Sequence, residues 1–123
     1  MATLETNARN AACNAIVDLI DAGTGPGTLV FETSGDVEVS TLTFSDPAFG
    51  GASLGTATAG SIASDTSATG GTIAQGSFYD SNGTKVLEAT AALSGADINL
   101  SSISISAGDI VSVTSLTVTM PAS

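Results

Sequence analysis

The side chains that could carry covalent or acid–base chemistry in this chain are few. Cys13 is the single cysteine, and the sequence contains no histidine. Histidine is the commonest general base, the usual partner of a serine or cysteine nucleophile, and the commonest zinc ligand. Cys13 lies among apolar neighbours in the segment AACNAIV, where a thiol is usually a small buried hydrophobic group. The sequence therefore predicts neither nucleophilic catalysis nor a zinc site.

Carboxylates are the other groups that could do chemistry. Glu32, Glu38 and Glu88 could form the acid pair of a glycoside hydrolase, but no nearby tryptophan or tyrosine offers a sugar platform. Aspartates at expected turns could offer hard oxygen ligands to a calcium ion, but their spacing lacks the close alternation of a calcium loop. They more often accept hydrogen bonds from their own following backbone. These aspartates are Asp36, Asp46, Asp65, Asp80, Asp97 and Asp109. We expect no enzyme activity, no metal site and no cofactor.

A glycine-rich segment, Gly23 to Thr28 (GTGPGT), superficially suggests a phosphate-binding loop. A phosphate loop opens a helix and carries a lysine that reaches the phosphates. In this chain the glycines follow an expected helix, a proline interrupts them, and lysine is missing. The segment is therefore predicted to be a helix-to-strand linker.

The charge balance argues against several classes of partner. Twelve acidic residues stand against two cations, Arg9 and Lys85, and the net charge is −10. Proteins that bind nucleic acid need lysine and arginine to replace phosphate counterions, so we expect no binding to DNA, RNA or anionic lipid. The N-terminus has no basic segment followed by an apolar core, and the apolar runs are shorter than a membrane span. The sequence predicts a protein retained in soluble form in a cytoplasm, then used there or built into a particle.

One helix must position Cys13 and its neighbours within a single domain, residues 1–123. The helix is predicted over Leu4 to Ala22, with Thr3 as N-cap and Gly23 as C′ residue. One apolar face is formed by Leu4, Ala8, Ala11, Ala12, Ala15, Ile16 and Leu19. Three further residues, Arg9, Cys13 and Val17, broaden that face on one side. The remaining narrow stripe holds Asn7, Asn10, Asn14, Asp18 and Asp21.

An apolar arc this broad has two interpretations. The helix could be covered on two sides, by a sheet and by another subunit or partner. Alternatively, it could lie deep in a groove of its own sandwich. Both interpretations remain open at the level of the sequence.

Residues 28–120 predict an antiparallel β-sandwich, jelly-roll-like and of six to eight strands, because short alternating segments are separated by turn signals about every ten residues. Strands are expected over Thr28–Thr33 and Val37–Phe44. The alternation of the second strand changes between Val39 and Leu42, which predicts a β-bulge or a switch between sheets. A weak strand is expected over Leu54–Ile62.

The C-terminal half is expected to consist of two strand pairs. Asp80 to Gly83 (DSNG) is predicted as the turn of a hairpin between Thr72–Tyr79 and Thr84–Leu93. The last pair is expected between Ile98–Ser106 and Asp109–Met120. The segment Ala63–Gly71 (ASDTSATGG) is expected to be an exposed loop.

Several long phrases of this chain resemble a group of small proteins encoded by tailed bacteriophages and prophages. These phrases are LETNARNAACNAIVDLIDAGTGPGTL, LTFSDPAFGGASLGTATA, YDSNGTKVLEA and SGADINLSSISISAGDIVSVTSLTVTMPAS. The likeness covers nearly the whole chain, and its motifs describe turns, strands and one helix. The resemblance implies a virion structural protein. Within that class it implies a capsid decoration, or cement, protein that binds the outer surface of the major capsid protein shell and stabilises it.

This role implies protein partners and a location. The partner would be the major capsid protein or another virion protein, and the location would be the virion, at the capsid surface, after synthesis in the host bacterial cytoplasm. A thin core and a broad helix face favour a homo-oligomer, either a dimer or a trimer. Contacts are expected from one helix face and two loops, through Arg9, Cys13, Val17, Asp46, Pro47, Phe49, Ser64, Asp65 and Thr66.

Two other functions remain open. The first is a tail, collar or fibre-associated component of the virion. The second is a module that binds carbohydrate or a cell surface. The second function predicts exposed aromatic side chains, whereas most of the five aromatic residues lie at core-like positions of the expected strands.

Overall fold

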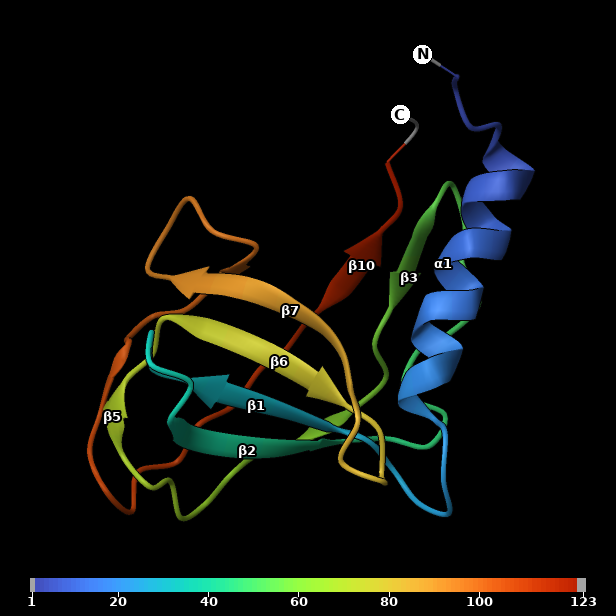
Figure 1. Ribbon diagram of the computed structural model, residues 1–123. Helices are drawn as coiled ribbons and strands as arrows, with labels where there is room; N and C mark the ends of the chain where they lie inside the picture. Colours follow the sequence, from blue (N-terminus) through green and yellow to red (C-terminus); the bar gives the residue numbers. More distant parts are fainter. Residues whose placement is uncertain (1, 122–123) are drawn as a thin grey trace.

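The computed structural model describes residues 2–121 of the chain, which form one helix followed by short strands (Figure 1). The helix is α1 (Thr6–Ile20). The strands are β1 (Thr28–Glu32), β2 (Glu38–Phe44), β3 (Thr56–Thr58), β4 (Ile62–Ala63), β5 (Gly71–Thr72), β6 (Gln75–Tyr79), β7 (Lys85–Ala92), β8 (Ile98–Asn99), β9 (Ser104–Ile105) and β10 (Thr117–Thr119). The protein is therefore mainly β with one N-terminal helix, as the sequence predicts.

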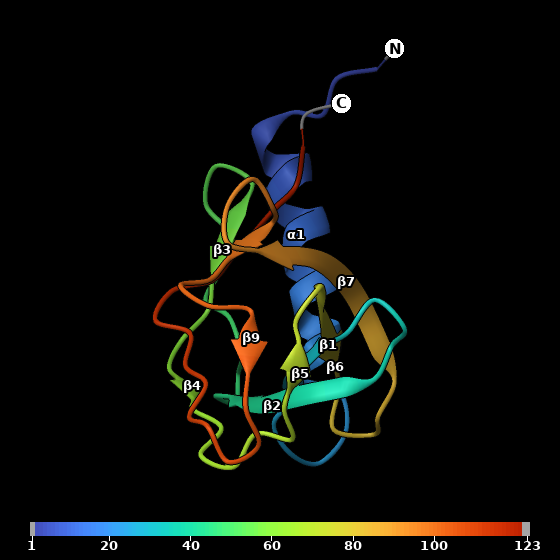
Figure 2. The same cartoon turned by 90° about the vertical axis from the view of Figure 1, so that its left-hand side faces the viewer.

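Six of the strands form one curled sheet in the order β4-β2-β1-β6-β7-β8. Neighbours in this sheet are antiparallel, except that β7 and β8 run parallel. Two small antiparallel ladders, β10-β3 and β5-β9, contain the other named strands of residues 2–121. Figure 1 shows α1 at one end of the long strands and β5 at the other, and Figure 2 shows β5 and β9 side by side in front of the sheet.

The last strand pair expected from the sequence does not form. Instead of pairing with each other, the two C-terminal segments are distributed over three ladders, as β8 on β7, β9 on β5 and β10 on β3. The physical reason lies in the turns at Gly95 and Gly108, where the chain takes positive φ angles of 72° and 87°. Each turn redirects a segment of only two or three ladder residues to a different neighbour.

The predicted hairpin is present between β6 and β7. Asp80 Oδ1 accepts hydrogen bonds from the backbone N–H groups of Asn82 and Thr84, each at 2.9 Å. The residue is 9% exposed, so its carboxylate satisfies donors that water reaches poorly. Asp80 thus shapes the turn, as aspartate commonly does.

The predicted change of alternation in β2 is confirmed as a β-bulge. Phe31 of β1 faces Ser40, whereas the next residue, Glu32, faces Glu38. Val39 is therefore the extra residue, and the bulge allows both Val39 and Leu42 to reach the core, where each is 0% exposed.

The helix is shorter than predicted. It begins after Glu5, which is the N-cap residue and makes no side-chain capping bond, so Thr3 does not cap it. At the other end the C-cap is Asp21. Gly23 has φ 97°, the left-handed conformation expected of it, but stands two residues beyond the C-cap, one position later than predicted.

The face of α1 that packs against the rest of the protein is not one that the sequence singles out. It packs on β3, β7 and β10. Cys13, Val17 and Ile20 are the buried side chains of this inner face, at 0%, 2% and 0% exposure. The inner face is completed by part of the polar stripe, through Asn10, Asn14 and Asp21.

These polar side chains bind the chain segment between β2 and β3. The Oδ1 atom of Asn10 accepts a hydrogen bond from Gly55 N–H, and Asn14 Oδ1 accepts one from Ala52 N–H, both at 2.8 Å. Asp21 Oδ1 accepts from Ala48 N–H at 2.8 Å. We call these three bonds the helix ladder. They satisfy backbone donors of a segment that has few sheet partners, which explains why this part of the polar stripe lies inside.

Aromatic rings from three segments meet in the core next to the helix. The centroids of Phe44 and Phe49 are 5.6 Å apart, and those of Phe44 and Phe78 are 5.7 Å apart. The Phe49 and Phe78 rings stack at 6.5 Å. Such separations are typical of favourable aromatic pairs, so this cluster joins β2 and β6 to the loop after β2.

The segment expected to be a weak strand over Leu54–Ile62 begins with a turn and is divided between β3 and β4. Ser53 and Thr56 exchange backbone hydrogen bonds of 2.9 and 3.0 Å, with Leu54 and Gly55 between them. Both central residues have positive φ, 52° and 78°, which defines a two-residue hairpin turn of the I′ type. We call residues 53–56 the β3 turn.

The segment Ala63–Gly71 is also more ordered than expected. Asp65 and Val111 exchange backbone hydrogen bonds at 3.0 and 2.8 Å, and Thr69 N–H donates to Val39 O at 2.9 Å. Ala68, between them, is 3% exposed. The segment is therefore tied to β2 on one side and to the C-terminal part of the chain on the other.

Candidate functional site

The three helix residues expected to contact a partner are occupied within the chain itself. Cys13 is fully buried, and its Sγ donates a hydrogen bond to Val118 O at 3.3 Å. Val17 is buried beside it. Arg9 donates from Nε to Met120 O at 3.1 Å and from Nη2 to Leu54 O at 3.2 Å. This face therefore holds the helix to β3 and β10 and is not free for another protein.

The loop residues expected at an interface fall into two groups. Phe49 is buried in the aromatic cluster, and Asp65 is half-buried, so both serve the fold. The remaining residues are exposed: Asp46, Pro47, Ser64 and Thr66. Ser64 Oγ donates to Ser112 Oγ at 3.0 Å, which adds a further tie between its loop and the C-terminal segment. Four of the nine expected contact residues are thus exposed on the surface.

Asp65 collects three hydrogen bonds on its carboxylate. Ser40 Oγ donates at 2.8 Å and Thr41 N–H at 3.0 Å to Oδ2, and Ser67 N–H donates at 2.9 Å to Oδ1. Burial by itself raises the pKa of this carboxyl, but the hydrogen bonds from Ser67, Thr41 and Ser40 together outweigh burial and hold the pKa below its usual value. Asp65 is therefore an ionised structural centre at neutral pH.

The side of α1 that faces away from the sheet is apolar. We call it the outer helix face, and it consists of Leu4, Ala8, Ala11, Ala15 and Leu19, all of which are exposed. Leu19 is 56% exposed and Leu4, just before the helix, 41%. Glu5 and Asp18 flank this face and are also exposed. The sequence identified these apolar residues as one face. It did not indicate that this face is left uncovered by the rest of the chain.

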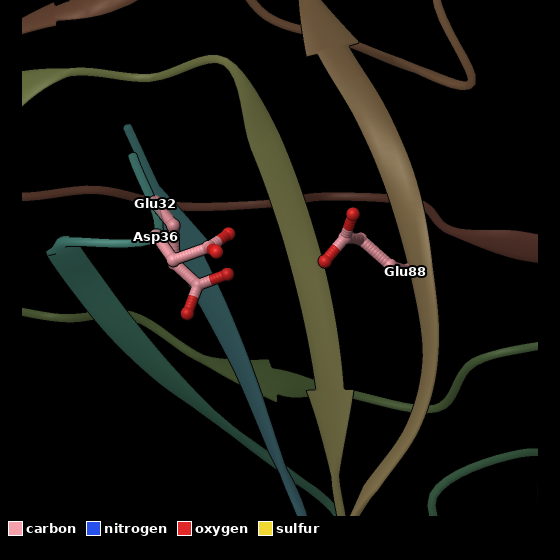
Figure 3. Close-up of side chains that lie close together, drawn as sticks. All are labelled: Glu32, Asp36 and Glu88. Atoms are coloured by element: carbon pink, nitrogen blue, oxygen red, sulfur yellow. The ribbon is translucent and has the colours of Figure 1, made fainter. Parts of the chain in front are cut away.

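Three carboxylates gather on the outer side of the six-stranded sheet (Figure 3). Glu32 at the end of β1, Asp36 in the following turn and Glu88 on β7 place carboxylate oxygens within 4.8 Å of one another. Figure 3 shows Glu88 pointing across β6 towards the other two. Oxygen ligands at this spacing are of the kind that calcium uses. Sequence reasoning grouped Glu32 and Glu88 only as possible acids of a glycoside hydrolase, and it named Asp36 separately as a turn residue.

The carboxylate of Glu32 already has protein partners. Oε1 accepts from Ser77 Oγ at 2.6 Å and from Gln75 Nε2 at 3.1 Å, and Oε2 accepts from Tyr79 OH at 3.3 Å. Glu32 is only 5% exposed, so these donors replace the water it has lost. Gln75 Nε2 also donates to Asp36 Oδ1 at 2.5 Å. The cluster is thus organised as a hydrogen-bonded network.

Both cations of the chain are engaged within the fold. Lys85 Nζ lies 2.9 Å from Glu88 Oε2, and this hydrogen bond is the main reason why the pKa of Lys85 is raised. The Arg9 guanidinium is directed at backbone carbonyls of Leu54 and Met120. The remaining charged side chains on the described surface are carboxylates, so the surface presents a strongly negative field to any partner.

A groove of about 590 Å³ lies beside the C-terminal segment. It runs between residues 97–102 and 110–117, with Ile105 also on its wall. Its lining mixes serine and threonine with aliphatic side chains and contains one carboxylate, that of Asp97. It therefore lacks the converging charged groups of a catalytic pocket.

Within residues 2–121, no helix is both long enough and apolar enough to cross a membrane. Comparison of the chain with known protein families, with curated proteins and with solved structures found no match.

Proposed function

We propose that this protein is a structural component of a tailed-bacteriophage virion, namely a capsid decoration protein on the outer surface of the major capsid protein shell. The proposal begins from the resemblance of its sequence phrases to small phage and prophage proteins. The structural observation that carries it is the outer helix face, because an exposed apolar strip on an acidic protein favours binding to another protein. The strip would be buried when the protein docks.

Decoration would stabilise the shell through repeated contacts. Each copy would bury a modest apolar area, and the symmetry of the shell would repeat that contact many times. A copy that bridges two neighbouring capsid subunits gains from the high effective concentration of the second contact. A compact β body with tied loops suits this role, because little conformational freedom is then lost on docking.

A tail, collar or fibre-associated position in the virion is the second candidate. It would use the same apolar face, and it differs from decoration in the number of copies per particle. A carbohydrate-binding module is supported less well, since Phe31, Phe44, Phe49 and Phe78 are buried and Tyr79 is half-buried with its hydroxyl on Glu32. Sugar-binding sites commonly need exposed aromatic rings.

The deciding experiment is a count of copies in purified virions of the phage or prophage that encodes this chain. The band of this protein is quantified against the major capsid protein by stained gel and by mass spectrometry. Decoration predicts hundreds of copies per particle. A handful to some dozens would favour the tail or collar, and complete absence from the particle would overturn the virion proposal.

The proposed dimer or trimer is tested separately by light scattering on the purified protein at micromolar concentration. A monomer at that concentration would count against a stable homo-oligomer. It would leave open a decoration protein that docks as single copies.

A further inference from the structure

Leu54 stands at the tip of the β3 turn in a conformation that leucine rarely adopts. Its φ is 52°, in the left-handed region, where an L-residue with a Cβ is strained. Its side chain is 74% exposed, the highest value among the large exposed hydrophobic residues of the described chain. The residue therefore combines backbone strain with an apolar side chain in water.

The fold does not account for leucine at this position. The first central residue of an I′ turn is usually asparagine, aspartate or glycine, because these residues tolerate positive φ. The second central residue, Gly55, follows this rule and is buried, with φ 78°. Leu54 neither fits the turn nor packs in the core. Strained residues of this kind are concentrated at functional sites, where another requirement maintains them.

The backbone around Leu54 is held firmly from two directions. Arg9 Nη2 donates to Leu54 O at 3.2 Å, and Gly55 N–H donates to Asn10 Oδ1 at 2.8 Å. Gly55 O accepts from Met120 N–H at 2.7 Å. Figure 1 shows the turn before β3 beside the first turns of α1, at the end of the molecule away from β1 and β2. The leucine is thus presented on a braced, projecting turn, which lowers the entropic cost of binding.

We propose that Leu54 is the anchor residue of a docking contact and inserts into an apolar pocket, rimmed by lysine or arginine, on the virion protein that carries this chain. The inference rests on the proposed function for the identity of that partner. It adds to that function a specific contact residue and the chemistry of the surface that receives it.

Charge complementarity assigns the basic rim to the partner. This chain carries a net charge of −10, and Arg9 and Lys85 are both engaged within the fold. A second copy of this chain would bring another −10 to the contact and could offer only these two cations. A basic rim on a different protein would attract the acidic body and speed docking.

The test is the variant Leu54→Asn, which places the preferred residue in the I′ turn while removing the anchor. The matched control is Leu93→Asn, the same change at a leucine that is 58% exposed in the loop after β7 and has no positive φ. Virions of the encoding phage that lack this protein serve as the probe. Binding of each purified variant is measured by co-sedimentation and by quantitative gel.

We expect L54N to unfold at a temperature equal to the wild type or about 2–5 °C higher, because backbone strain is relieved. We expect its affinity for the particles to fall by about tenfold or more, as for loss of an interface anchor, while L93N binds as the wild type does. Wild-type binding should weaken as NaCl is raised, because the salt screens the attraction between the acidic chain and the basic rim.

The outcomes separate the two proposals. If the wild type does not bind the particles, the proposed function fails, and this inference fails with it. If the wild type binds and L54N binds equally well, the inference alone is overturned. Binding that is insensitive to salt would overturn the basic rim. A wild-type oligomer that L54N dissociates in sedimentation would show that the pocket belongs to a second copy, contrary to the proposal.

Discussion

Asp65 joins three parts of the chain through a single residue. Its backbone N–H and C=O pair with Val111, and its carboxylate accepts hydrogen bonds from Ser40, Thr41 and Ser67. The C-terminal segment has short ladders, so this residue is one of the few firm connections between that segment and β2. Composition alone predicted an exposed loop here, because nothing in ASDTSATGG marks a residue with partners far away in sequence.

We expect the stabilising effect of Asp65 to depend on pH. The pKa is lowered in the folded protein from a usual value of 3.8, so the ionised form stabilises the fold above that pH. The contribution is lost as the pH falls below 3.8 and through the folded-state pKa. The variant Asp65→Asn should therefore be less stable than the wild type by about 1–3 kcal/mol at pH 7.

Urea unfolding of both proteins between about pH 7 and pH 2.5 checks this expectation. The difference in unfolding free energy should shrink at the acid end, where the wild-type carboxyl becomes neutral like the amide. A difference that stays constant over the whole pH range would contradict the assigned hydrogen bonds.

Glu32 is the second residue whose surroundings make a definite prediction. Its carboxylate accepts from three donors, so Glu32→Gln places an amide NH2 group against Ser77, Gln75 or Tyr79. We expect a loss of about 1–3 kcal/mol in unfolding free energy, measured in urea. The control is Glu88→Gln, which removes an exposed ion pair with Lys85 and should cost less than about 1 kcal/mol.

The same variants test whether the carboxylate cluster takes up a cation. Because the Glu32 oxygens already accept hydrogen bonds, we expect calcium chloride to leave the unfolding temperature of the wild type unchanged. A rise with calcium that disappears in both E32Q and E88Q would show instead that the cluster is a metal site.

At the scale of elements, α1 shows why apolar spacing alone does not tell which side of a helix is covered by its own chain. Leu4, Ala8 and Leu19 have helical spacing, yet they are exposed. The inner face carries Cys13, Val17 and Ile20 together with the acceptors of the helix ladder. A periodicity argument counts asparagine as a solvent residue. Periodicity carries no information about a neighbouring segment whose backbone N–H groups need acceptors.

The helix ladder predicts an inversion of the usual effects of substitution. Asn14→Ala should lower the unfolding free energy by about 1–2 kcal/mol, because Ala52 N–H loses its acceptor in a partly buried place. Leu19→Ala removes a larger side chain, but one that is 56% exposed, and should change stability by less than about 0.5 kcal/mol. Thermal and urea unfolding of the two variants would reveal the order. A larger cost for L19A than for N14A would contradict the orientation of α1.

Local sequence signals predicted the middle strands well, whereas the pairing of strands far apart in sequence was harder to predict. The Asp80 hairpin and the bulge at Val39 follow from residues close together in sequence, namely a turn tetrapeptide and a change of alternation. By contrast, the pairing of β10 with β3 joins segments far apart in sequence, and β8 pairs with β7 in parallel, so no turn signal between them predicts either pairing. The strands β3, β8 and β10 have only two or three residues each, so no hydrophobic pattern is long enough to select one neighbour over another.

The candidate surfaces were less predictable than the fold. The acidic cluster requires the turn after β1 to bring Asp36 beside Glu32, and it requires β6 to place Glu88 opposite them. The strain at Leu54 arises because the two central residues of the hairpin turn are Leu-Gly in place of the usual Asn-Gly. Neither arrangement has a distinctive sequence motif.

For the whole molecule, the net charge of −10 sets the response to salt. Carboxylates on one small body repel one another, and this repulsion favours the expanded, unfolded chain. We expect the unfolding temperature at pH 7 to rise when NaCl is increased from about 10 to about 150 mM, because the screening length falls from about 30 to about 8 Å. Differential scanning fluorimetry or calorimetry can follow the change.

The control for this salt effect is the same titration at a pH near 4, where many carboxylates are protonated. The rise should then be much smaller. An unfolding temperature that falls with NaCl at pH 7 would mean that attractive charge pairs outweigh the repulsion, contrary to the single ion pair found among residues 2–121.

The helix ladder also bears on how this protein would diverge among its relatives. Asn10, Asn14 and Asp21 hold the backbone of their own chain, so they should persist whatever the protein binds. The residues of the outer helix face make no such contacts within their own chain. They are free to change in step with the sequence of a partner. We therefore expect an alignment of relatives to show constant polar positions inside α1 and drifting apolar positions outside, the reverse of the usual pattern in a helix.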